Sequence, residues 1–246
     1  ASGPGPCDDL IDCSARWFLK TNISTEEAPL KLAIFDFDGT LVHTAPDICN
    51  AVNDFLQLHH HDPMPVQKIR EEIGMGLNEL IYRVVPEARN HPELFEEIYS
   101  QFRKIYEEHI LRQPQFFAGC LEFLDSWTDQ AAILSKKNKK YVRMNLKHLN
   151  QHDSQWVTIV GGDTFESKKP HSLPFEKVLA CASVDRSEAF IVGDGRPDIE
   201  GALNVGIKSV AVSFGYEPID QLMQLGAHAR MDHYSELPSI IAQLSA

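Results

Sequence analysis

Five short apolar runs, separated by stretches with helical spacing, constrain the fold of this 246-residue chain more than any other feature. Runs of this kind are typical of strands in a parallel sheet, because helices cover both faces of such a sheet and bury every side chain. Strands and helices that alternate form βαβ units with right-handed crossovers. We therefore predict an α/β fold whose core is a Rossmann-like, doubly wound parallel sheet. The runs are "KLAIFDF" (31–37), "AAILS" (131–135), "WVTIVGG" (156–162), "AFIVGD" (189–194) and "SVAVSF" (209–214).

The segment 47–117 interrupts this alternation. Its apolar residues recur at helical spacing, as in "PELFEEIYSQFRKIYEEHI" (92–110), and it contains no strand-like run. We therefore expect an all-helical cap inserted between the first strand and the remainder of the sheet. The predicted domains are a core of residues 31–46 and 118–246, a cap of residues 47–117, and a leader of unknown role at residues 1–30.

Net charge and cysteine usage restrict the partners and the compartment that we expect. A net charge of −12 disfavours nucleic-acid backbones and anionic membranes as partners. No apolar run reaches the roughly 18 residues that a membrane span needs. The five cysteines include no CxxC pair, which disfavours a disulfide framework. We expect a cytoplasmic protein, monomeric or homodimeric, that acts without nucleic acid or membrane.

Polar side chains stand where four of the predicted strands end. In an open α/β sheet, ligands bind outside the carboxyl ends of the strands, so these side chains are expected to meet at one site. Together they provide carboxylates, a hydroxyl and lysines. In chain order they are Asp36, Asp38, Gly39 and Thr40, then Ser135 and Lys136, then Lys169, and finally Asp194 and Asp198.

A metal ion would explain why so many carboxylates gather at one end of the sheet. A divalent cation removes their mutual repulsion, and hard oxygen ligands suit Mg²⁺. A hydroxyl, backbone amides and a lysine suit the oxygens of a phosphoryl group. One aspartate can then attack phosphorus while a second transfers protons. The pattern therefore predicts phosphoryl transfer at a magnesium site.

Taken one at a time, these residues have simpler explanations. Asp-Gly is a common turn signal, Ser135 suits a cap or a turn, and Lys169 suits the surface. A calcium loop is excluded because Gly39 stands at the fourth position of the pattern rather than the sixth. The order of the groups at successive strand ends favours the catalytic interpretation.

On these residues the chain resembles the haloacid dehalogenase-like hydrolases, a superfamily dominated by Mg²⁺-dependent phosphatases. The motifs that match are "DFDGT" (36–40), Ser135, Lys169 before Pro170, and "GDGRPD" (193–198). The resemblance implies that Asp36 is the nucleophile and Asp38 the general acid and base. It implies metal ligation by Asp36, Asp38 through its backbone carbonyl, Asp194 and Asp198, and phosphate binding by Ser135, Lys136, Lys169, Gly39 and Thr40.

Within that superfamily the chain is most similar to the phosphoglycolate phosphatase branch. The similarity lies in "DGTLVHTAPDI" (38–48), "IGMGLNELI" (73–81) and "KPH" (169–171). His43 stands where the branch usually has Asp, Ser135-Lys136-Lys137 replaces Thr-Asn-Lys, and Ser172 replaces Pro. These departures preserve the chemistry but leave the substrate open. The candidates for substrate specificity are Thr44, Arg70, Met75, Asn78 and Arg83.

The resemblance predicts a Mg²⁺-dependent phosphomonoester hydrolase that works through an aspartyl-phosphate intermediate. The expected substrate is a small phosphorylated metabolite, either 2-phosphoglycolate-like or a sugar phosphate. Asp38 disfavours a dehalogenase and the phosphonate-cleaving relatives, which lack an aspartate there. A sugar phosphomutase is an alternative, although relatives of that kind carry histidine where this chain has Ile48. The other alternative is a non-catalytic, phosphate-binding scaffold, which is disfavoured because Asp36, Asp38 and Lys169 are all retained.

Overall fold

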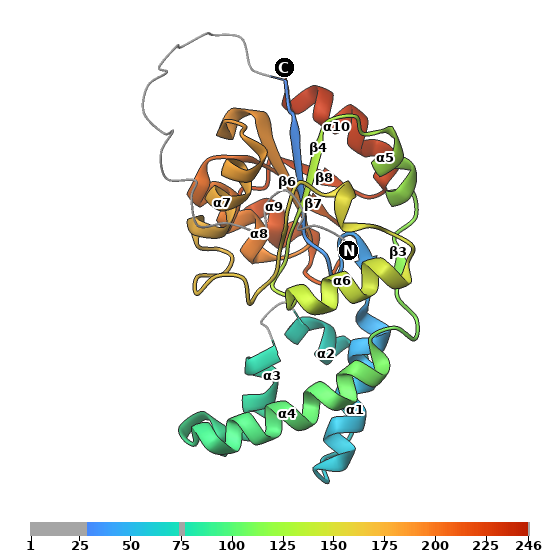
Figure 1. The fold of residues 1–246 in the computed structure, drawn as a ribbon, viewed down its shortest axis with the longest axis vertical. Coiled ribbons are helices and arrows are strands. Elements are labelled where there is room, and N and C mark those ends of the chain that lie inside the picture. The colour runs from blue at the N-terminus through green and yellow to red at the C-terminus, as the bar shows by residue number, and fades with distance from the viewer. Residues whose placement is uncertain (1–28, 74–76, 246) are drawn as a thin grey trace, which may run out of the picture.

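A six-stranded parallel sheet forms the centre of the computed structural model, which describes residues 29–73 and 77–245 (Figure 1). The strand order is β5-β4-β1-β6-β7-β8, and every neighbouring pair is parallel. The predicted α/β fold class is confirmed, whereas the predicted leader lies almost wholly outside the described residues. The strands are β1 (Leu32–Phe35), β4 (Gln130–Leu134), β5 (Ile159–Val160), β6 (Ala189–Gly193), β7 (Lys208–Val212) and β8 (Ala229–Met231).

Strand β1 is continuously apolar because both faces of the sheet are covered. Ala33 and Phe35 face one apolar cluster, and Leu32 and Ile34 face the other. The first cluster includes side chains of α5 (Cys120–Ser126), α6 (Lys139–His148) and α10 (Leu237–Leu244). The second includes side chains of α7 (Ser172–Ala182) and α8 (Arg196–Val205), and α9 (Ile219–Gln224) packs beside them (Figure 1). Buried in the middle of the sheet, β1 delivers the residues that follow it to the centre of the carboxyl edge.

The helices of the insert lie beyond that edge and have an apolar core of their own (Figure 1). Phe55, Ile69, Ile81 and Phe102 are buried together there, away from both faces of the sheet. The helices are α1 (Ala45–Leu58), α2 (Val66–Ile73), α3 (Leu77–Val84) and α4 (Pro92–His109), with a 3₁₀ turn at Pro86–Asn90.

Two short strands join the insert to the core. Strands β2 (Val42–His43) and β3 (Gln115–Phe116) pair antiparallel where the chain enters and leaves the insert. Both carboxylate oxygens of Asp47 accept the backbone N–H of Gln113, each at 3.1 Å, which ties the two crossings together. The expectation that 47–117 contains no strand is therefore wrong at its end, because a two-residue strand leaves no apolar run to read.

The structure differs from the predicted strands at two other places. The run at 156–162 contributes only the two residues of β5 to the sheet. Strand β8 was not predicted, because it lies at the edge of the sheet, where only Met231 of its three residues is buried. Among the helices of the described residues, none is both long enough and apolar enough to span a membrane.

Candidate active site

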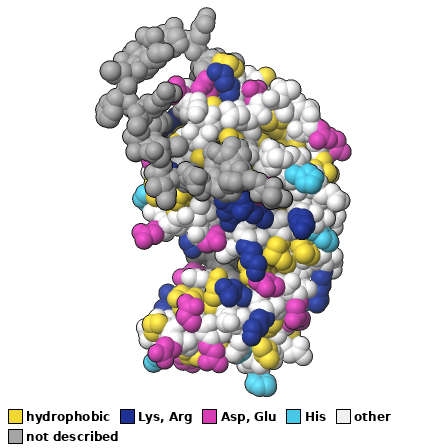
Figure 2. Space-filling model, in the orientation of Figure 1, with side chains coloured by type: hydrophobic (Ala, Val, Ile, Leu, Met, Phe, Trp, Pro, Cys, Tyr) yellow, Lys and Arg dark blue, Asp and Glu magenta, His cyan; other side chains and the backbone are white. Residues whose placement is uncertain are grey.

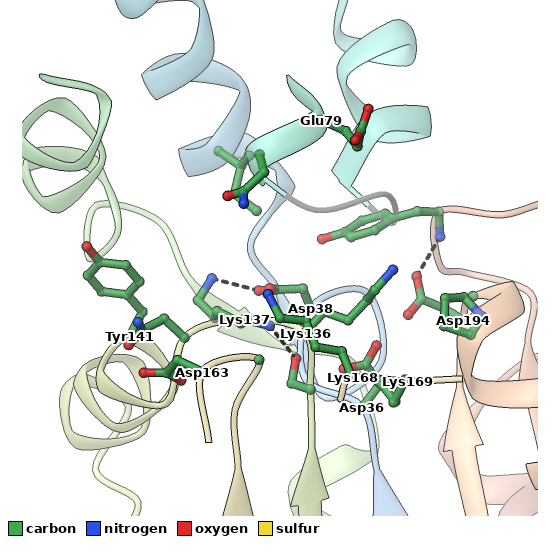
Figure 3. A pocket seen from close by; sticks show the side chains of 18 of the residues that line it. Asp36, Asp38, Glu79, Lys136, Lys137, Tyr141, Asp163, Lys168, Lys169 and Asp194 are labelled. Atoms are coloured by element: carbon green, nitrogen blue, oxygen red, sulfur yellow. Dashed lines mark hydrogen bonds and ion pairs between the residues drawn. The ribbon is translucent and has the colours of Figure 1, made fainter. Parts of the chain in front are cut away.

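The strand ends bring most of the predicted site residues into one cavity of about 360 Å³ (Figure 3). The cavity lies between the carboxyl edge of the sheet and the helices of the insert, since residues of α1, α2, α3 and α4 also line it. Several Lys and Arg side chains gather at the level where insert and core meet on the face shown in Figure 2. The predicted site residues that line the cavity are Asp36, Asp38, Asn78, Ser135, Lys136, Lys169, Asp194 and Asp198.

Three carboxylates form the centre of the site. One oxygen from each of Asp36, Asp194 and Asp198 lies within 4.8 Å of the others. Burial raises the pKa of Asp194 well above its usual range, and the neighbouring Asp36 and Asp198 raise it further. Burial likewise raises the pKa of Asp198 to about 7, although Lys169 opposes this shift. Two buried carboxyl groups that resist ionisation, next to a third carboxyl group and with only hard oxygen donors, fit a divalent cation such as Mg²⁺.

Lys169 supplies a positive charge inside this cluster. Its Nζ lies 3.1 Å from Asp36 Oδ1 and 2.5 Å from Asp198 Oδ1, and its side chain is almost completely buried. Burial alone would lower the pKa of Lys169, but the two aspartates outweigh it and raise that pKa. The ammonium is therefore charged and stands beside the carboxylate that is predicted to attack phosphorus.

Residues behind the cluster hold Asp194 in place. Asp194 Oδ1 accepts the Thr40 hydroxyl at 2.9 Å, and Oδ2 accepts the Tyr216 N–H at 2.9 Å. Gly39 has a φ of 81°, and a Cβ there would lie 2.2 Å from Asp194 Oδ2, so both the turn and the close approach require glycine. Neither Gly39 nor Thr40 is among the residues that line the cavity. Phosphate binding by these two residues stays a prediction.

Two side chains hold Asp38, one from Thr44 at the start of α1 and one from Lys137 after β4. Its Oδ1 accepts the Thr44 hydroxyl at 2.5 Å and the Lys137 ammonium at 2.9 Å, the second of which is drawn in Figure 3. Lys137 Nζ also donates to Tyr106 Oη at 2.6 Å. Burial would lower the pKa of Lys137, but Asp38 and Tyr106 together raise it above its usual range. Thr44 therefore positions Asp38 in this structure, while its predicted role in specificity stays untested.

Lys137 was recognised in the motif after β4 but was given no role in the site by the sequence analysis. The run Ser135-Lys136-Lys137 follows β4 directly, so all three residues could have been assigned to the site from their place in the motif. Ser135 is buried, and its hydroxyl accepts the Lys137 N–H at 3.2 Å. Lys136 lines the cavity, and burial lowers its pKa.

The predicted specificity residues of the insert are placed unevenly. Asn78 lines the cavity, whereas Arg83 is exposed and is absent from its lining. Arg70 also lies outside the lining, but its guanidinium donates to Gly215 O at 3.1 Å and lies 5.5 Å from the centre of the Tyr216 ring. Met75 lies outside the described residues.

The sequence analysis did not predict that aromatic side chains line this cavity. Tyr99, Phe102 and Tyr106 project from α4 into the lining of the cavity, and Tyr141 and Tyr216 join them from the core. The spacing of three and four residues on α4 signals one helix face, but it does not say whether that face meets a core or a cavity.

Comparison with known proteins agrees with this geometry. The sequence model of the haloacid dehalogenase-like hydrolases matches residues 33–212. A phosphoglycolate phosphatase of Neisseria meningitidis is 32% identical over 197 residues, which are 77% of this chain and 83% of the relative. A second, from Chromobacterium violaceum, is 29% identical over 215 residues, 85% of this chain and 95% of the relative.

Solved structures share the fold. The crystal structure of a predicted phosphoglycolate phosphatase from Haemophilus somnus aligns with a TM-score of 0.76 at 24% identity, over 86% of this chain and 97% of the other. A second crystal structure, of a protein from Lactobacillus delbrueckii assigned to the same activity, aligns with a TM-score of 0.77 at 22% identity, over 87% of this chain and 99% of the other.

The chain belongs to the haloacid dehalogenase-like hydrolases. Within them it falls in the phosphoglycolate phosphatase-like branch and is a phosphatase, as the sequence analysis predicted.

Proposed function

We propose that this protein is a Mg²⁺-dependent hydrolase of small phosphomonoesters that works through an aspartyl-phosphate. One observation carries the proposal: Asp36, Asp38 and Lys169 line a single cavity, with Lys169 Nζ 3.1 Å from Asp36 Oδ1. A carboxylate, a second carboxylate beside it and a buried cation are the groups that nucleophilic attack on a phosphoryl group requires.

In the first step, a carboxylate oxygen of Asp36 attacks phosphorus while the bond from phosphorus to the ester oxygen breaks. Asp38 gives its proton to that leaving oxygen. In the second step, a water molecule loses a proton to Asp38 and attacks the phosphorus of the aspartyl-phosphate. This step releases inorganic phosphate and restores the Asp36 carboxylate.

Other residues of the chain hold the phosphoryl group during both steps. Ser135, Lys136 and Lys169 line the cavity on the side of the nucleophile and are suited to bind the non-bridging oxygens. The residues that would hold Mg²⁺ are Asp36, Asp194 and Asp198, together with the backbone carbonyl of Asp38. When bound, the ion supplies positive charge that neutralises these carboxylates and the phosphoryl oxygens.

The insert is proposed to act as a cap over the site. The domain division at 47–117 is supported by the apolar cluster that α1 to α4 form, to which the core contributes Tyr141 of α6. A cap that excludes water from the cavity would require a leaving group that fits beneath it. Such a cap favours compact substrates such as 2-phosphoglycolate. The relatives from Neisseria meningitidis and Chromobacterium violaceum are both named phosphoglycolate phosphatase. A monomer or homodimer in the cytoplasm remains our proposal. Its cytoplasmic part is supported by Cys49 and Cys120, which form no disulfide within the described part of the chain.

The test is phosphate release from 2-phosphoglycolate, a sugar phosphate and a phosphopeptide, each with and without Mg²⁺. We expect Mg²⁺-dependent turnover, with higher kcat/KM for the two small esters than for the phosphopeptide. Rapid quenching followed by mass spectrometry should find one added phosphoryl group on the peptide that contains Asp36. No hydrolysis of any phosphomonoester in Mg²⁺ would contradict the proposed function.

A further inference from the structure

A hydroxyl from the insert reaches the catalytic carboxylates. Tyr106 is on α4, yet its Oη lies 2.6 Å from Lys137 Nζ, which is itself 2.9 Å from Asp38 Oδ1. The Tyr106 hydroxyl is therefore two hydrogen bonds away from the group proposed to protonate the leaving oxygen.

The direction of these hydrogen bonds leaves the Tyr106 proton to be donated elsewhere. The nitrogen of an ammonium group has no lone pair that can accept a hydrogen bond, so Lys137 donates and the phenol oxygen of Tyr106 accepts. Among the residues that the structure describes, no group is recorded as accepting the Tyr106 proton, and Tyr106 lines the cavity. Burial raises the pKa of Tyr106 to about 12, so that the hydroxyl keeps its proton at neutral pH.

The packing of its ring fixes where this hydroxyl points. The ring stacks on Phe102, with centroids 5.9 Å apart, and the edge contact with Tyr141 has centroids 5.1 Å apart. Tyr106 is 6% exposed, and its contact with Lys137 holds the far end of the side chain. A donor held this rigidly loses little side-chain entropy when it binds a ligand.

We propose that Tyr106 is a specificity-determining residue whose hydroxyl donates a hydrogen bond to a carboxylate on the leaving group of the substrate. The inference rests on the proposed function, because it takes Asp38 as the group that protonates the ester oxygen. A carboxylate bonded to the carbon next to that oxygen lies only a few bonds away, which matches the short separation of Asp38 and Tyr106.

The surroundings favour an anionic acceptor over an apolar one. The positive charge on Lys137 draws electron density from the phenol oxygen and makes the Tyr106 proton a stronger donor. Lys136 and Lys168 also line this cavity, where they offset part of the negative charge of its carboxylates, which include Glu79 and Asp163. An apolar substituent would leave the buried hydroxyl without an acceptor, which carries a desolvation cost.

The experiment compares Tyr106→Phe with the wild type on two substrates of equal carbon number, 2-phosphoglycolate and ethyl phosphate, in Mg²⁺. The second lacks the carboxylate. Tyr82→Phe is the matched control, because Tyr82 is also an insert tyrosine packed on aromatic and arginine side chains but is absent from the cavity lining. Both substrates are assayed on the same preparation, so a partial loss of folded enzyme cancels in the ratio.

We expect the wild type to prefer 2-phosphoglycolate, and Tyr106→Phe to lower the ratio of the two kcat/KM values by about tenfold, as for a hydrogen bond to a charged group. Tyr82→Phe should leave the ratio at the wild-type value. An unchanged ratio in Tyr106→Phe, or no preference in the wild type, overturns the inference while hydrolysis of either ester leaves the proposed function intact. Absence of all Mg²⁺-dependent hydrolysis overturns the proposed function itself.

Discussion

In the α/β core, several polar side chains of the cavity come directly after strands, whereas in the helical insert they project from the sides of helices. Asp36, Ser135 and Asp194 each follow the last residue of a strand or lie next to it. Tyr99 and Tyr106 instead lie within α4, whose other faces are packed against the insert or exposed. These three core residues are therefore placed by their position along the chain, and the insert residues by how their helix packs.

The two regions also differ in how tightly their groups are bound to one another. Lys169, Asp198 and Asp36 form a buried network within the core. The insert reaches the core through separate contacts outside this network, among them Tyr106 with Lys137, Glu107 with Lys140 at 2.7 Å, and Arg70 with Gly215. This comparison leads us to expect that changes in the core abolish the chemistry, while changes in the insert alter selectivity or ligand affinity.

The largest expected effect comes from Asp36→Asn in the core. Turnover should fall to background, because an amide is not a useful nucleophile for phosphorus. The variant should stay folded, since asparagine has nearly the shape of aspartate and Lys169 keeps its ion pair with Asp198, and thermal unfolding would check this. Asp129→Asn, an exposed aspartate that does not line the cavity, is the control. Near wild-type rates in Asp36→Asn would require a different nucleophile.

Removal of the metal should have an effect of similar size. Chelation should abolish turnover, since Asp36, Asp194 and Asp198 share one buried site, and added Mg²⁺ should restore it. Ca²⁺ should inhibit, because its larger and more flexible ligand shell can turn the Asp36 carboxylate away from phosphorus. The measurement is phosphate release during metal titration, and full activity in excess chelator would contradict the magnesium site.

Asp38→Asn should have a smaller effect than either. The variant loses proton transfer but keeps the nucleophile, so turnover should fall by about 10²–10⁴-fold. The loss should be smaller for a substrate whose leaving group needs no proton, such as p-nitrophenyl phosphate. Equal losses for this ester and for an alkyl phosphate would argue against proton donation by Asp38.

The smallest expected effect is that of Arg70→Met in the insert. Arg70 braces Gly215 and Tyr216, and the N–H of Tyr216 positions Asp194. Loss of one hydrogen bond and one cation–π contact should raise the Mg²⁺ concentration for half-maximal activity by about threefold to tenfold. The control is Arg89→Met, which removes an insert arginine that also stacks on a tyrosine but contacts Glu79 rather than the core. If both variants behaved alike, the brace between insert and core would have no role in metal binding.

The order of motifs by itself determined most of the core. A strand buried on both faces must be continuously apolar, so β1, β4, β6 and β7 could be recognised from short segments. The ligand end of a parallel sheet is the end where the chain leaves each strand, so the residues after those strands were assigned to the site without knowledge of strand order. The helices of the insert were likewise recognisable from the spacing of their apolar residues.

Contacts between segments that are distant in the sequence were decided only by the tertiary structure. Strand β8 carries Arg230 and has no apolar run, and its place at the sheet edge depends on pairing with β7. The pairing of Lys137 with Asp38 joins residues 99 positions apart, and its contact with Tyr106 depends on which face α4 turns to the core. Helical periodicity defines a face but not its partner, and that partner is set by the packing of the insert against the carboxyl edge of the sheet.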